Sequence, residues 1–167
     1  MPDAALIRPA VTADFPAIAA IYGHHVLHGT GSFETEAPSV DEMLRRHDEV
    51  SRHHLPYVVA EQSGEVVGYA YAAPYRPRPA YRFTVEDSVY MHPERTGKGL
   101  GRLLLDAIVG ASFATGCKQM IAIIGDSENA ASIRLHQSAG FTHVGTLRNV
   151  GLKFDRWLDT VIMQKAL

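Results

Sequence analysis

A glycine-rich loop separates an apolar run from a predicted helix, with glycines at Gly97, Gly99 and Gly101. Because glycine has no Cβ, the backbone can turn tightly there and approach a ligand closely. The first N–H groups of the following helix have no partner within the helix and attract anions, so the loop predicts a phosphate site beside Lys98 and Arg102. The spacing fits neither the nucleoside-triphosphate loop nor the dinucleotide fingerprint. Taken alone, this pattern is equally typical of a tight turn.

Three titratable side chains are candidates for proton transfer. Glu86 and Asp87 are adjacent in the apolar run before the loop, and a regular strand would direct them to opposite faces. His136 lies on a short predicted helix. The structural alternatives are solvated carboxylates at a strand end and a histidine that packs in the core.

Length and charge restrict the class of protein. The 167 residues, 46% of them hydrophobic, predict one compact domain that spans residues 1–167. A net charge of -2 argues against nucleic-acid or membrane partners and favours a small-molecule ligand. The single cysteine, Cys117, excludes an internal disulfide, and no leader or long apolar span is visible, so we expect a cytoplasmic protein. His24 and His28 have helical spacing, but no metal motif accompanies them and no metal is expected.

Predicted strands and helices alternate along the chain. Thr12 is expected to cap the first helix, while Ser39 and Glu42 form a capping-box pattern that begins the second. The predicted strands cover residues 6–9, 57–61, 66–73, 83–91, 120–124, 141–147 and 157–163, and the helices cover residues 14–28, a segment after 39, a segment from 100 to Gly116, and residues 129–139. The third helix is expected to bury one face formed by Leu100, Leu103, Leu104, Ala107 and Ala111. This order predicts a three-layer α/β fold with a mixed, mostly antiparallel central sheet flanked by helices.

Five segments together resemble the GNAT superfamily of N-acetyltransferases, in the branch of phosphinothricin and methionine sulfoximine acetyltransferases. They are the glycine loop and the segments Thr84–Tyr90, Asn129–His136, Ala139–Phe141 and Val150–Asp159. The resemblance extends over nearly the whole chain. One departure is Thr96, which stands where the family usually has Gln or Arg.

The resemblance implies acetyl-coenzyme A as co-substrate and assigns residues to it. Those expected to hold its pyrophosphate are Gly97, Lys98, Gly99, Leu100, Gly101 and Arg102. Val89, Tyr90 and Met91 are expected to bind the pantetheine arm through their backbone, and Asn129 is expected to form a further hydrogen bond. A strand edge with unpaired amides suits such an arm.

The implied reaction is acetyl transfer to the α-amine of a small amino-acid analogue such as methionine sulfoximine, methionine sulfone or phosphinothricin. Glu86 is the expected base, directly or through water, since an amine with a pKa of about 8 is mostly protonated at neutral pH. His136 is the expected acid for the leaving thiolate, with Tyr90 as an alternative. The residues expected around the substrate are Phe33, Arg76, Arg78, Glu86 and Asp87, the arginines pairing with its carboxylate.

Two other functions remain open from the sequence. The same fold acetylates protein N-termini and other amines, and a non-catalytic sensor of acyl-coenzyme A would need neither Glu86 nor His136. The family precedent also suggests a homodimer. The natural substrate stays undetermined, because a pocket for an amino-acid backbone discriminates side chains only modestly.

Overall fold

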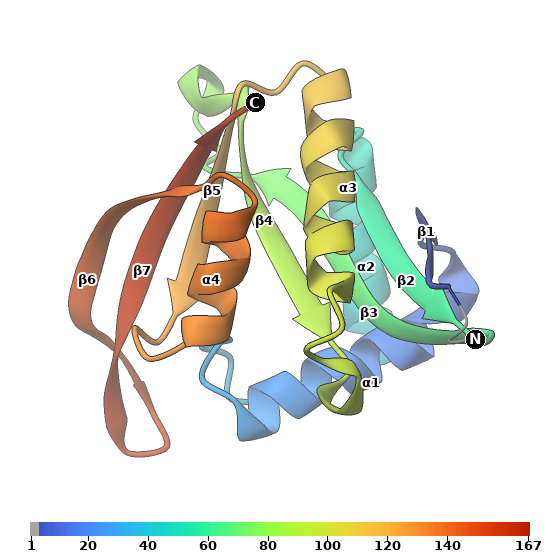
Figure 1. Ribbon diagram of the computed structural model, residues 1–167, viewed down its shortest axis with the longest axis horizontal. Helices are drawn as coiled ribbons and strands as arrows, with labels where there is room; N and C mark the ends of the chain where they lie inside the picture. The colour runs from blue at the N-terminus through green and yellow to red at the C-terminus, as the bar shows by residue number, and fades with distance from the viewer. Residues whose placement is uncertain (1–3) are drawn as a thin grey trace.

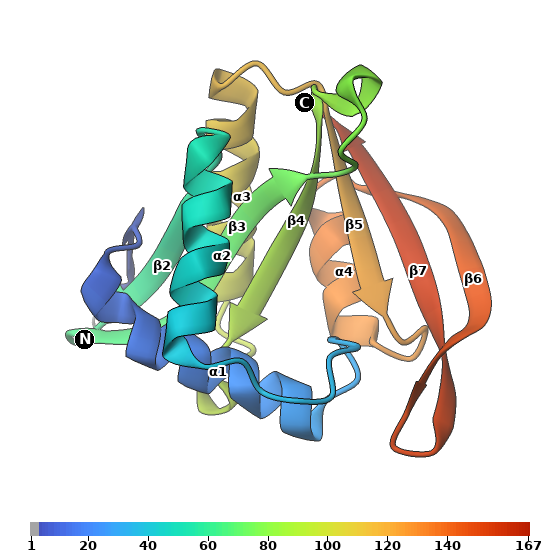
Figure 2. The ribbon, with the colours of Figure 1, turned by 180° about the vertical axis from the view of Figure 1, so that it is seen from behind.

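Seven strands form one sheet between two layers of helices in the computed structural model, which describes residues 4–167 (Figures 1 and 2). The elements are β1 (Leu6–Pro9), α1 (Phe15–His28), α2 (Val40–Arg52), β2 (Tyr57–Gln62), β3 (Glu65–Pro74), β4 (Thr84–Met91), α3 (Leu100–Ala114), β5 (Gln119–Gly125), α4 (Ala130–Ser138), β6 (Thr142–Lys153) and β7 (Arg156–Ala166). The sheet order is β1-β2-β3-β4-β5-β7-β6. The predicted mixed, three-layer α/β fold is confirmed.

Strands β4 and β5 form the one parallel pair among the described strands. Helix α3 connects them across one face of the sheet, as a crossover between parallel strands requires. Their register contains three pairs, from Thr84 with Gln119 to Glu86 with Ile121. Beyond Glu86 the two strands separate while β4 stays paired to β3 and β5 to β7, so the sheet opens into a fork (Figure 1).

The helices form two cores on opposite faces of the sheet. Helices α3 and α4 cover the face shown in Figure 1, where Leu104, Ile108 and Met120 are buried. Helices α1 and α2 cover the face shown in Figure 2, where Phe15 and Tyr69 are buried. Side chains alternate between the two cores along each strand, so consecutive residues at the fork face different layers.

The structure corrects three local predictions. Helix α1 begins at Phe15 after a 3₁₀ turn, and Thr12 does not cap it; the Asp14 carboxylate accepts a hydrogen bond from the Val11 amide instead (2.8 Å). Strands β6 and β7 are longer than predicted, because a tight turn at Phe154 and Asp155 joins them.

The predicted cap of α2 is confirmed, since Ser39 accepts a hydrogen bond from the Glu42 amide (3.1 Å).

The third correction concerns Leu103, which is 48% exposed although it was expected on the buried face of its helix. The side chains of α3 buried against the sheet are Leu100, Leu104, Leu105, Ile108 and Ser112. The buried stripe is therefore rotated away from Leu103 and centred on Leu104.

Between residues 4 and 167, none of the helices is both long and apolar enough to cross a membrane.

The neighbouring leucines of α3 offer a matched test of this packing. Leu104→Ala should lower the free energy of unfolding by about 2–5 kcal/mol, because it leaves a cavity under a fully buried side chain. Leu103→Ala should lower it by less than about 1 kcal/mol, because its side chain is half exposed. Urea denaturation of both variants measures the two changes. Equal losses would contradict the burial of the helix face described above.

Candidate active site

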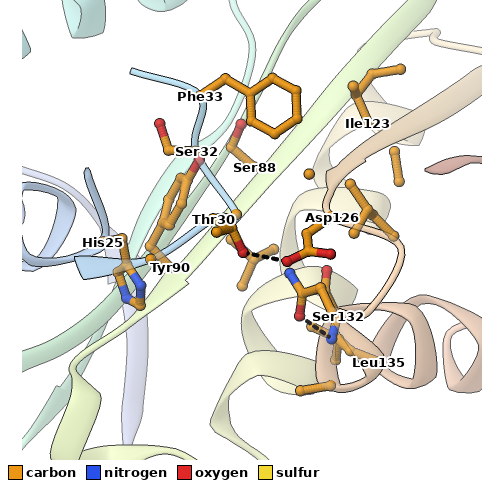
Figure 3. Close-up of a pocket in the computed structure, with 18 of the residues that line it drawn as sticks. His25, Thr30, Ser32, Phe33, Ser88, Tyr90, Ile123, Asp126, Ser132 and Leu135 are labelled. Carbon is orange, nitrogen blue, oxygen red and sulfur yellow. Dashed lines mark hydrogen bonds between the residues drawn. The ribbon is translucent and has the colours of Figure 1, made fainter. Parts of the chain in front are cut away.

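A cavity of about 800 Å³ opens between the separated strands β4 and β5 (Figure 3). The predicted site residues that line it are Phe33, Glu86, Asp87, Val89, Tyr90, Met91, Asn129 and His136. Residues 29–34, after helix α1, form another part of its wall. The fork thus brings together segments from the first fifth, the middle and the last third of the chain.

The glycine loop lies at the N-terminus of α3, outside the lining of the cavity. Gly97 and Gly99 have φ angles of 75° and 78°, a left-handed conformation that favours glycine, and Gly99 is the N-cap of the helix. An added Cβ would contact nothing within 4 Å at either position, so the backbone angle accounts for both glycines. Lys98 between them is exposed. The exposed helix N-terminus fits a phosphate group.

Arg102, in the first turn of α3, already has protein partners. Its guanidinium bonds the Asp106 carboxylate (2.8 Å) and the Ser138 carbonyl (2.5 Å). The side chain therefore connects α3 to the end of α4, and any contact with a phosphate would compete with these bonds.

Glu86 is the last residue of β4 paired to β5, and it lies on the sheet face covered by α1 and α2. It pairs in register with Ala73, next to the pairs of Tyr71 with Ser88 and Tyr69 with Tyr90. Burial raises the pKa of its carboxyl group, the charge of Asp87 adds to the rise, and the charge of Arg76 opposes it. A carboxylate with a raised pKa is a stronger base than an exposed glutamate, which suits proton abstraction.

Asp87 points to the other face and forms a buried pair with His136. The distance from Asp87 Oδ2 to His136 Nε2 is 2.8 Å, and the two side chains are 2% and 5% exposed. On the other side of the ring, His136 Nδ1 lies 2.7 Å from the backbone carbonyl of Ser132. Burial lowers the pKa of His136, but the hydrogen bond and charge of Asp87 outweigh it, and the pKa is raised. The site therefore holds a histidine with a raised pKa, hydrogen-bonded to a buried carboxyl group.

A second polar network supports the wall formed by residues 29–34. The Glu34 carboxylate accepts two hydrogen bonds from Arg46 (2.7 and 2.9 Å) and one from the Tyr22 hydroxyl, and Arg46 lowers its pKa. Lys153, which is 4% exposed, donates from Nζ to the Ser32 carbonyl (2.7 Å). These contacts fix the loop to helix α2 on one side and to strand β6 on the other.

Phe33 lies between this loop and two glycines of the sheet. A Cβ added at Gly151 would lie 2.4 Å from its ring, and one added at Gly125 would lie 2.9 Å from it. Figure 3 shows the Phe33 ring at the side of the cavity. At Gly125 an added Cβ would also lie 2.6 Å from the Thr30 carbonyl, so the ring accounts for Gly151, and the ring together with the loop backbone accounts for Gly125.

The remaining wall is held by short hydrogen bonds near the ends of β4 and β5. His25 Nε2 donates to the Met91 carbonyl (2.7 Å), and the Thr30 hydroxyl donates to Asp126 (2.7 Å). The Asn129 side chain accepts a hydrogen bond from the Ser132 amide as the N-cap of α4 (Figure 3). The Nδ2 group of Asn129 lies toward Gly31, 3.6 Å from where a Cβ there would stand.

Arg76 and Arg78 lie in the proline-rich loop after β3 and do not line the cavity. Arg76 stacks over the Tyr75 ring at 5.0 Å and is close enough to Glu86 to affect its pKa. Arg78 is exposed and precedes a 3₁₀ turn at Pro79–Tyr81. Of the two, Arg76 has the closer electrostatic connection to the site.

Several residues of the site were missed in the sequence: Tyr22, His25, Thr30, Ser32, Arg46, Asp126, Ser132 and Lys153. Ser132 and Lys153 lie within segments that carried the family resemblance, which was the one signal available for them. The others gain their roles from tertiary contacts. Within the part of the chain that the structure describes, no three histidine, cysteine, aspartate or glutamate side chains are grouped so as to hold a metal ion.

The chain is similar to known acetyltransferases in sequence and in fold. The model of the Acetyltransferase (GNAT) family matches residues 21–141. The chain is 50% identical to a phosphinothricin N-acetyltransferase of Alcaligenes faecalis, over 98% of this chain and 83% of the other. It is 43% identical to an L-methionine sulfoximine/L-methionine sulfone acetyltransferase of Salmonella typhimurium, over 96% of this chain and 94% of the other.

A solved structure is similar throughout. It is a GNAT superfamily phosphinothricin acetyltransferase from Sinorhizobium meliloti in complex with AcCoA, with a TM-score of 0.95 and 46% identity over 98% of this chain and 88% of the other. The family match, the identities and the shared fold lead to one conclusion: the chain belongs to the GNAT family of acetyltransferases.

Proposed function

We propose that this protein transfers the acetyl group of acetyl-coenzyme A to the α-amine of a small amino-acid analogue of the methionine sulfoximine, methionine sulfone or phosphinothricin type. The observation that carries the proposal is the half-buried Glu86 at the vertex of an open fork, in a chain 50% and 43% identical to enzymes named for these substrates. We further propose that residues 1–167 act as one N-acetyltransferase domain.

The fork fits acetyl-coenzyme A in three respects. The left-handed glycines at the start of α3 leave the helix N-terminus open for the pyrophosphate through the backbone of residues 97–102. The inner edge of β4 at Val89, Tyr90 and Met91 has no strand beside it to take up its amides. When bound, the co-substrate supplies the acetyl group as a thioester, and Asn129 lies on the cavity wall beside its path.

The face covered by α1 and α2 is the proposed side for the amine. Glu86 faces this side, and Phe33 forms an apolar wall near it. Arg76 supplies positive charge near Glu86, as a substrate carboxylate requires. Asp87 is the next residue of the same strand, but its side chain bonds His136 on the opposite wall of the cavity.

In the proposed chemistry, a side chain on each wall of the cavity assists one proton transfer. Glu86 takes a proton from the substrate nitrogen, directly or through one water molecule, so that the nitrogen can attack the thioester carbon. As the C–S bond breaks, the nitrogen releases its second proton to solvent and becomes the amide nitrogen, and His136 supplies the proton for the departing sulfur. Glu86 and His136 return to their starting states by exchange with solvent.

Release of free coenzyme A thiol tests the function. The purified protein should release thiol with methionine sulfoximine, methionine sulfone or phosphinothricin, and more slowly with peptides that have a free N-terminus. Faster reaction with peptides would favour an N-terminal acetyltransferase. Binding of acetyl-coenzyme A with no release for any amine would favour a sensor and contradict the proposal.

Glu86→Gln tests the assignment of the base. We expect kcat to fall by about 100-fold or more, because the amide cannot accept the proton, while the Kd for coenzyme A stays within about twofold. In the parent enzyme, kcat should decline toward acid as Glu86 becomes protonated, and its raised pKa places this decline above that of an ordinary glutamate. The variant should lose this limb of the pH profile.

Glu65→Gln is a matched control for this variant, since Glu65 is exposed at the β2–β3 turn and lies outside the cavity. It should leave kcat and the pH profile unchanged. A full rate in Glu86→Gln would remove Glu86 from the mechanism.

We also propose a homodimer formed through the β6–β7 hairpin. Strand β6 is at the edge of the sheet. The hairpin exposes an unusual set of large apolar side chains, Val144, Leu147, Val150, Leu152, Phe154 and Trp157. An apolar edge strand of this kind is a surface that a second chain covers.

A cytoplasmic location fits the free thiol of Cys117, which a reducing compartment maintains.

Trp157→Glu tests the proposed dimer. Light scattering after size exclusion should give the mass of two chains for the parent protein and of one chain for the variant, because a charge cannot be buried unpaired in the interface. Phe113→Glu is the matched control, since Phe113 on α3 is 60% exposed and Trp157 is 64% exposed. A monomeric parent protein, or equal loss of the dimer in both variants, would contradict the proposed interface.

A further inference from the structure

The His136–Asp87 pair leaves open which group delivers a proton to the sulfur. Both ring nitrogens of His136 contact acceptors, Asp87 Oδ2 at 2.8 Å and the Ser132 carbonyl at 2.7 Å. The histidine side chain is 5% exposed, so its ring does not reach far into the cavity. A proton from His136 therefore needs an intermediate group.

Ser132 is in position to be that group. Its hydroxyl lies 3.4 Å from His136 Nδ1, and its residue lines the cavity, as Figure 3 shows. The hydroxyl accepts from the same N–H that bonds the Ser132 carbonyl, one turn back along α4. Its own hydrogen is then free to point to a ligand, because a hydroxyl donates one hydrogen bond while it accepts another.

The order Asp87, His136, Ser132 resembles the arrangement that activates a serine nucleophile, but the hydrogen positions differ. A backbone carbonyl can only accept, so Nδ1 carries a hydrogen. Nδ1 therefore has no lone pair with which to take the hydroxyl proton. The arrangement delivers a proton toward the cavity and does not generate an alkoxide.

We infer that Ser132 is the catalytic group that donates a proton to the sulfur of coenzyme A as the thioester C–S bond breaks, with His136 and Asp87 as the proton source behind it. This inference rests on the acetyl transfer proposed above. Ser132 Oγ gives its hydrogen to the sulfur and receives one from His136 Nδ1. His136 becomes neutral and keeps the Nε2 hydrogen that bonds Asp87.

The raised pKa of His136 is consistent with this direction of transfer, because the hydrogen bond and the charge of Asp87 favour the protonated ring. Glu86 is on the opposite sheet face and takes the amine proton, so the two transfers do not compete for one group. The site starts and ends each cycle with the same number of protons after exchange with solvent.

Ser132→Ala should lower kcat by about 100-fold or more, the lower end of the range for loss of an acid catalyst, while the Kd for coenzyme A measured by calorimetry stays within about twofold. Ser132→Thr keeps a hydroxyl and should recover most of the rate. At a pH of about 8.5, where a free thiol is half ionised, the thiolate fraction of bound coenzyme A should be lower in Ser132→Ala. Ultraviolet absorbance of the binary complex measures this fraction without turnover.

Ser112→Ala is the matched control, because Ser112 is a buried serine of helix α3 outside the cavity. It should change neither kcat nor the Kd. The double variant Ser132→Ala/His136→Gln should have a kcat no lower than that of the slower single variant, because both substitutions interrupt the same proton relay.

Three results would overturn the inference in a protein that transfers acetyl groups. One is a kcat for Ser132→Ala within twofold of the parent. Another is a weaker Kd for coenzyme A with an unchanged kcat, which would make Ser132 a binding contact. The third is an acetylated Ser132 peptide, detected by mass spectrometry after rapid quenching, which would make it a nucleophile.

Discussion

The site depends on the point at which β4 and β5 stop pairing. Three residue pairs hold these strands together, and past Glu86 each keeps only its outer neighbour, β3 or β7. Buried backbone N–H and C=O groups need partners, so the inner edges of the fork are suited to a ligand that carries amides. The same divergence makes room for helix α4 on one side and for the loop after α1 on the other. The opposed walls of the cavity, which we propose hold the two substrates, therefore follow from one break in the sheet.

Two consecutive residues at the point where β4 and β5 separate line opposite walls of the cavity. Because side chains alternate along a strand, Glu86 and Asp87 are separated into different helix layers although they are covalent neighbours. Asp87 is compensated by His136, as a buried carboxylate must be, whereas Glu86 has only the more distant charge of Arg76. Two identical functional groups thus have different surroundings: burial raises the pKa of Glu86, while Asp87 is hydrogen-bonded to a histidine ring. The polar network of Glu34, Arg46 and Tyr22 then holds the facing loop at a fixed distance from both.

Local patterns in the sequence were sufficient to predict most elements of the fold, because apolar spacing and glycine placement report directly on helices, strands and turns. They failed where packing against another element decides which side chains are buried. Leu103 fits an apolar helix face by spacing, yet Leu104 is the leucine that the sheet buries. The glycine spacing alone predicted the loop, and the family resemblance then selected Glu86 as the base. The pairs of Asp87 with His136 and of Lys153 with Ser32 join residues 49 and 121 positions apart, and such pairs depend on the sheet order, which no local pattern contains.

The contact of Phe33 with Gly151 has a consequence for how this enzyme could diversify. Gly151 belongs to a strand at the rim of the sheet and lines no part of the cavity, yet any larger residue there would push the aromatic ring inward. With Phe33 as the proposed wall for the amine, the breadth of amines accepted then depends in part on a position that never meets them. Variants with altered selectivity can arise by substitutions in the outer hairpin, leaving the reactive groups untouched.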